Sequence, residues 1–158
     1  KEFPRGVKLY EGLITTYRSI MTDGKEGQAE RQMFANFLDE AAIILQKPAL
    51  NGIAAQFRSA GQTWNDLATA LLPDSVALLK EAREVMWNSF QGFLNQGADP
   101  ERLRYRKERL KAIKAQVTSD FPMSDAEVVD LRQDIADHVR KIHDIEFQAI
   151  NELKQVMV

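Results

Sequence analysis

The stretch PALNGIAAQFRSAGQTWNDLATALLP, residues 48–73, decides the fold class of this chain. The 24 residues between its two prolines can form one helix of about 36 Å, at ~1.5 Å per residue. Apolar side chains recur along it at alternating steps of four and three residues, which places them on one face. These residues are Ile53, Phe57, Ala60, Trp64, Leu67 and Leu71. We expect this helix to be the centre of a bundle, with Trp64 mostly buried between the second, fourth and sixth helices.

Helical periodicity continues on both sides of this stretch. Five further helices are predicted, over residues 7–21, 29–46, 76–95, 100–119 and 125–157. Glycine and proline separate several of them, as in the segments TDGKEGQ (residues 22–28) and NQGADPE (residues 95–101). The clearest start signal is Ser124 followed by Glu127, which is the spacing of a capping box. No stretch shows the strict alternation of a strand, so the predicted fold is an all-α bundle of about six helices around a long central helix.

The same periodicity predicts which side chains face the core. In the second helix they are Met33, Phe34, Phe37, Leu38, Ala41, Ile44 and Leu45. In the fourth helix they are Val76, Leu79, Ala82, Met86, Phe90 and Phe93, and in the fifth Leu103, Leu110, Ile113 and Val117. In the sixth they are Val128, Leu131, Ile135, His138, Ile142, Ile145, Ala149, Leu153 and Val156.

Composition limits the class of protein. The 158 residues are enough for a single domain with a real core, and 44% hydrophobic and 28% charged residues are typical of a globular chain. A net charge of −2 and a pI near 5.8 argue against nucleic acid as a partner. The absence of cysteine excludes a disulfide, a thiolate metal site and a cysteine nucleophile within this chain. No apolar run approaches the ~18 residues of a membrane span, so we expect a cytoplasmic protein with no membrane partner.

The histidines offer one possible site. His138 and His143 lie five residues apart on the sixth helix, so their side chains point to different faces. His143 and Glu146 do share a face, at a spacing that metal sites in helical bundles use. No second helix carries a histidine to complete a di-iron pattern. We therefore predict no catalytic residue, no metal site and no cofactor, and keep a small-ligand or metal-dependent enzyme built around these three residues as an alternative.

The strongest charge feature lies in the fifth helix. Seven cations and one carboxylate occur between residues 102 and 114. Four of these cations share one face at helical spacing, namely Arg104, Lys107, Lys111 and Lys114. An ordinary solvated face is one interpretation, and a docking surface for an acidic protein or a phosphate-bearing ligand is the other. Because the rest of the chain is acidic, nucleic acid is not expected there.

Several stretches together resemble a known domain. They are GQAERQMFANFLDEAAIIL (residues 27–45), the PAL that follows, FRSAGQTWNDLATALLPD (residues 57–74) and IHDIEFQAINEL (residues 142–153). They are similar to the helical C-terminal domain of unknown function in proteins resembling the butirosin-pathway acyltransferase. In that family a papain-like N-terminal domain carries a cysteine nucleophile and moves an acyl group from an acyl carrier protein to an amine. This chain has no cysteine onto which that role could be carried.

The resemblance implies that residues 1–158 form one helical domain, the C-terminal module of a longer protein. Its implied role is that of a non-catalytic accessory domain, which shapes the substrate cleft of the papain-like domain or docks an acyl carrier protein. We expect no enzymatic activity from this chain alone. A free-standing helical interaction or oligomerisation module is the alternative from a different class.

Overall fold

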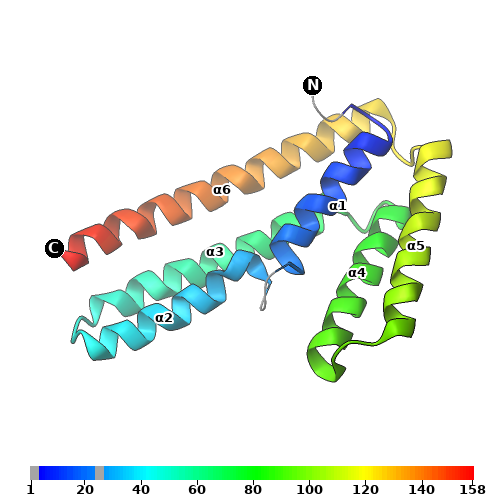
Figure 1. Ribbon diagram of the computed structural model, residues 1–158. Coiled ribbons are helices and arrows are strands. Elements are labelled where there is room, and N and C mark those ends of the chain that lie inside the picture. The colour runs from blue at the N-terminus through cyan, green and yellow to red at the C-terminus, as the bar shows by residue number, and fades with distance from the viewer. Residues whose placement is uncertain (1–3, 24–26) are drawn as a thin grey trace.

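The computed structural model describes residues 4–23 and 27–158, and within these residues it contains helices and no strand (Figure 1). The six α-helices are α1 (Val7–Met21), α2 (Arg31–Ile44), α3 (Ala49–Leu71), α4 (Ala77–Gln96), α5 (Pro100–Ser119) and α6 (Asp125–Met157). A short 3₁₀ turn, η1 (Gln28–Glu30), precedes α2. The all-α prediction is confirmed. Residues 24–26 of the predicted 22–28 loop lie outside the described residues.

The central helix is α3, as its apolar face predicts. It packs against α1, α2 and α6, and Figure 1 shows α2 and α6 running along it to form one arm of the molecule. The helices α4 and α5 form a hairpin that points away from this arm, and α1 lies between the two parts (Figure 1). Both parts therefore meet at α1 and the carboxyl end of α3.

Two clusters of buried side chains hold these parts together. One lies at the junction, where α1, α4, α5, the end of α3 and the start of α6 meet, and Leu72 and Leu79 are fully enclosed in it. The other lies along the arm between α2, α3 and α6, around Phe57 and Ala149. Phe34 of α2 meets the Phe57 ring edge-on, with 4.7 Å between ring centroids. The apolar stripe of α3 thus serves both clusters.

Local signals fix the helix starts. The capping box of α6 is present: the Ser124 backbone N–H donates to Glu127 Oε2 at 2.7 Å, and the Glu127 N–H donates to Ser124 Oγ at 3.3 Å. The bonds that the Ser124 backbone N–H and hydroxyl donate to the Glu127 carboxylate hold its pKa below the usual range. In α5, Asp99 accepts from the Glu101 N–H at 2.9 Å and Pro100 occupies the first turn. Both starts agree with the sequence-based boundaries because the caps are encoded locally.

The predicted core face of α2 is wrong in part. This helix contacts α3 through Ala35, Leu38 and Ala42. Four other apolar residues predicted to be buried are at least 46% exposed, namely Met33, Phe37, Ile44 and Leu45. Apolar residues occur around more than one side of α2, and no described helix covers its outer side. Leu38 and the small alanines make the close contact, and these four larger side chains remain outside.

Three further burial predictions need correction. Phe93 and Leu103 are 55% and 44% exposed, because they lie near the turn that joins α4 to α5, where no other described helix covers them. Trp64 is only half-buried. Its indole N–H donates to Glu146 Oε1 at 2.8 Å, which places the ring at the edge between α3 and α6 rather than against α4.

Within the described residues, no helix combines the length and the apolar character needed to cross a membrane.

Candidate docking groove between α1 and α5

The basic helix α5 is held by contacts on the side opposite to its free lysines. Ile113 and Val117 are fully buried in the junction cluster. Arg109 binds Glu81 of α4 through two hydrogen bonds, one of them from Nη2 to Oε2 at 2.8 Å, and this pairing raises the pKa of the Arg109 guanidinium. These contacts fix the rotation of α5 about its axis. The cations on its other side are therefore presented in a defined direction.

A groove runs between α1 and α5, and we call it the α1–α5 groove. It consists of two adjoining hollows of about 490 and 550 Å³ that share Ile14 and Leu110 as lining residues. Its floor is apolar and consists of Ile14, Met86, Leu103 and Leu110. Its rim is mainly basic, because Arg18, Arg106, Lys107, Lys111 and Lys114 line it beside the single carboxylate of Glu11 and the hydroxyls of Thr15 and Thr22. Tyr10 closes one end, and burial raises the pKa of its hydroxyl to about 12, so this side chain is neutral.

Much of the positive charge on this rim is not neutralised. Lys114 binds Glu11 of α1 at 2.5 Å, and Arg18 binds Asp23 at 3.3 Å. In contrast, Arg106, Lys107 and Lys111 make no hydrogen bond or ion pair with any residue that the structure describes. The groove thus combines an apolar floor with three unpaired cations, which is a surface suited to an acidic and partly apolar partner.

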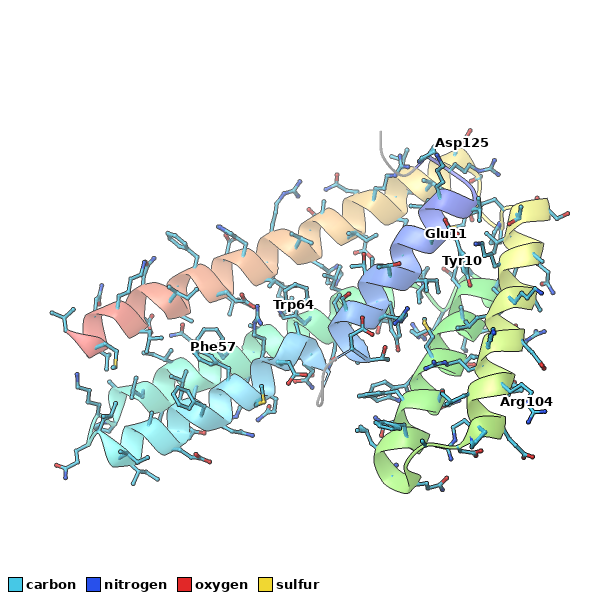
Figure 2. All side chains as sticks on the ribbon, viewed as in Figure 1. Tyr10, Glu11, Phe57, Trp64, Arg104 and Asp125 are labelled. Carbon is cyan, nitrogen blue, oxygen red and sulfur yellow. The ribbon has the colours of Figure 1, made fainter. Side chains whose placement is uncertain are left out.

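The structure brings together three of the four basic residues singled out from the sequence. All four are exposed, as expected. Lys107, Lys111 and Lys114 line the groove, whereas Arg104 does not. Figure 2 shows Arg104 on the side of α5 that faces away from α1, while Glu11 of α1 lies near the other end of α5. Arg104 contributes charge to the outer face of α5 rather than to the groove.

Sequence reasoning missed Arg18 and Arg106. A signal was present on α1, where Ile14 and Arg18 are four residues apart and therefore share a face. That the two faces meet could not be deduced, because it depends on how α1 packs against α5.

The three residues of the alternative enzyme site, His138, His143 and Glu146, do not converge on a common position. The ring of His138 binds the backbone carbonyl of Asp134 through Nδ1 at 2.9 Å. His143 is exposed and stacks on Phe147, with 5.7 Å between ring centroids. Glu146 is occupied by Arg31 and Trp64. Among the described residues, no group of three or more acidic, histidine or cysteine side chains is placed to hold a metal ion.

Comparison with known proteins gives one match. A family model described as a domain of unknown function (DUF4872) matches residues 11–102, which is more than half of the chain. The matched segment runs from the first helix to the start of α5, and so includes the α1 side of the groove and little of its α5 side. No curated protein and no solved structure gives a match.

Proposed function

Since the chain belongs to the family described as a domain of unknown function (DUF4872), we propose that it is a helical accessory domain of a papain-like acyltransferase and docks an acidic acyl carrier protein in the α1–α5 groove. The link to an acyltransferase comes from the resemblance of residues 27–45, 57–74 and 142–153 described above. The observation that carries the docking role is the apolar floor of the groove beneath a rim in which three cations have no partner among the described residues.

The chemistry of the groove favours an acidic helix as the docked element. Arg106, Lys107 and Lys111 give a local positive potential, although the chain as a whole has a net charge of −2. Exposed charges of this kind chiefly raise the association rate, and salt screens them over ~10 Å at 0.1 M. The apolar floor, around Ile14 and Leu110, then provides a surface that two apolar side chains of a helix can cover. The charges therefore raise the association rate of the partner, and the apolar floor stabilises the bound complex.

The test is charge reversal on the rim. We expect the double variant Lys107→Glu/Lys111→Glu to slow association with an acyl carrier protein about tenfold or more at low ionic strength. The difference should shrink toward none at 1 M salt, where the screening length is ~3 Å. Stopped-flow fluorescence with a labelled carrier protein measures both rates, and circular dichroism confirms that the helices persist.

A matched control is Lys141→Glu/Lys154→Glu, which makes the same change in net charge on α6. Both lysines are exposed and lie on the arm, away from the groove. The control should retain the wild-type association rate and salt dependence. Equal effects of the two double variants would show that only net charge matters, and no effect of either would leave α5 as an ordinary solvated face.

A second candidate function is helical oligomerisation or interaction through the arm. The exposed apolar side chains of α2 and α6 favour it, because Phe37, Ile44 and Phe147 are 58%, 78% and 61% exposed. Sedimentation velocity at several concentrations decides it. Self-association that Phe37→Ser/Ile44→Ser abolishes would support this candidate, and a monomer at all concentrations would exclude oligomerisation.

A further inference from the structure

A separate hollow also borders α1, and we call it the α3–α4 cleft. It has a volume of about 480 Å³. Its walls come from α1, η1, α3 and α4, and it shares no lining residue with the α1–α5 groove. Its polar and aromatic lining includes Tyr17, Gln28, Asn65, Arg83, Trp87 and Asn88. Nothing in the proposed docking role uses these residues.

Asn65 gives the first indication of a ligand. Its side-chain oxygen, Oδ1, is buried and has no hydrogen-bond partner among the described residues. A buried acceptor left without a donor costs roughly 1–3 kcal/mol, so such groups are rare in folded proteins. The neighbouring hydroxyl of Thr69 does not satisfy it, since Thr69 Oγ1 donates to the backbone carbonyl of Asn65 at 3.1 Å. Asn65 lines the cleft, but Oδ1 itself is shielded from solvent, so a ligand N–H or O–H supplies the missing donor once the Asn65 side chain turns toward the cleft.

The charges of the cleft exclude an anion as that ligand. Arg83 is the cation of the lining, and its guanidinium is already engaged. It donates to the Leu72 carbonyl at 2.9 Å and to Asp74 Oδ1 at 2.6 Å. Burial raises the pKa of the Tyr17 hydroxyl to about 12, so this side chain is neutral. Glu84, at the rim, lies 3.9 Å from Lys80. The charged groups of the lining thus already have partners within the protein.

Trp87 gives the cleft a flat aromatic wall. The ring is half-buried and lies 5.9 Å from the ring of Phe90, which supports it from within α4. Around it, the side-chain amides of Gln28 and Asn88 make no hydrogen bond to any described residue. Each amide offers both a donor and an acceptor in one plane. An aromatic wall beside free amides suits the face and edge of a planar heterocycle.

From this arrangement we infer that the α3–α4 cleft binds an uncharged planar heterocycle with a ring N–H, of the size and kind of a purine base. The ring stacks on Trp87, its N–H donates to Asn65 Oδ1, and the amides of Gln28 and Asn88 bind its remaining edge. The volume is within the range of small-molecule sites, about 300–1,000 Å³. This inference does not rest on the proposed carrier-protein docking, and either proposal can fail without the other.

Two purines that differ by one methyl group provide the sharpest test. Theophylline has a ring N–H where caffeine has an N–CH₃, and both are planar and uncharged at neutral pH. We expect theophylline to bind and to shift the amide resonances of residues that line the cleft in a ¹⁵N-HSQC titration. Caffeine should bind at least about tenfold more weakly, since it cannot donate to Asn65. Equal affinities, or no binding of theophylline at millimolar concentration, would overturn the inference.

Variants of the protein give an independent readout. Asn65→Ala removes the unpaired acceptor, so the ligand-free variant should melt at the wild-type temperature or above it, while theophylline binding falls to the caffeine level. Asn51→Ala, an exposed position on the same helix, is the matched control and should leave binding unchanged. Trp87→Leu should weaken both purines, because it removes the stacking surface. Wild-type theophylline affinity in Asn65→Ala and Trp87→Leu would show that the purine binds elsewhere, which would overturn the inference.

Discussion

At the scale of single residues, the most constrained group is the carboxylate of Glu146. Arg31 Nε and Nη2 donate to its two oxygens at 2.6 and 3.0 Å, and the Trp64 indole adds a third hydrogen bond. The Arg31 guanidinium also lies over the Trp64 ring, 5.6 Å from its centre. Burial alone would raise the pKa of Glu146, but the bonds from Arg31 and Trp64 and the charge of Arg31 together lower it. These three residues join the start of α2 to the carboxyl-terminal halves of α3 and α6.

This lowered pKa predicts a pH dependence of stability. A carboxyl whose folded-state pKa is depressed stabilises the protein above its unfolded-state pKa, here near 4.5, and loses that contribution as the pH falls through the folded-state value. Glu146→Gln should therefore lower the free energy of unfolding at pH 7 by about 1.5–3 kcal/mol. The difference from wild type should shrink as the pH falls below about 4.5. Urea unfolding at pH 7, 5, 4 and 3 measures it, with the exposed Glu40→Gln as control. A difference that stays constant with pH would contradict the assignment.

At the scale of elements, helix limits could be predicted where caps and breakers are local. The starts and ends of α1, α5 and α6 agree with the sequence-based ranges, because Gly, Pro and the Ser124 cap mark them. The start of α2 could not be predicted. Residues 28–30 adopt left-handed conformations, with φ of 55°, 48° and 62°, although none of them is glycine. Tertiary packing imposes this turn, since no residue type in it favours such angles.

The contact between α3 and this turn gives an element-scale prediction. Gly61 lies in the interior of α3, and a Cβ there would lie 2.8 Å from Gln28 Oε1 and 3.4 Å from Arg31 Cβ. A Cβ on Gly52, in the same helix, would meet nothing within 4 Å. Gly61→Leu should destabilise the fold by about 1–3 kcal/mol through overpacking. Gly52→Leu should be neutral or stabilise α3 by up to ~1 kcal/mol, because glycine is a poor helix former. Thermal melts of the two variants decide it, and similar melting temperatures would refute the close contact.

At the scale of the whole molecule, only the α5 side of the α1–α5 groove could be predicted from the sequence. The basic residues of α5 were evident from spacing alone, because they belong to one helix. The opposing wall, with Ile14 and Arg18, depends on packing over nearly 100 residues of sequence separation, which no local pattern encodes. For the same reason the exposed side of α2 was mistaken for a core face. Periodicity shows that a helix has an apolar face, but not which of two apolar faces another helix covers.

The accessory-domain proposal also predicts what the chain cannot do alone. It should show no peptidase, esterase or acyl-transfer activity, because it contains no cysteine and, within the described part of the chain, neither histidine is hydrogen-bonded to a side-chain hydroxyl. Assays with activated esters and acyl thioesters test this on the purified chain. Activity that persists through purification and disappears in His138→Ala or His143→Ala would favour an enzyme instead.

One helix, α1, forms a wall of both the α1–α5 groove and the α3–α4 cleft. Tyr17 lines the α3–α4 cleft, whereas Ile14 and Arg18 line the α1–α5 groove. These three residues lie within five positions of one another on the same helix. A ligand that displaces α1 when it binds in the cleft or in the groove alters the shape of the other site. Thermodynamic linkage then requires the influence to be reciprocal: the factor by which a ligand in the cleft changes affinity in the groove equals the factor by which a partner in the groove changes affinity in the cleft. The position of α1 would make the two surfaces a single allosteric unit.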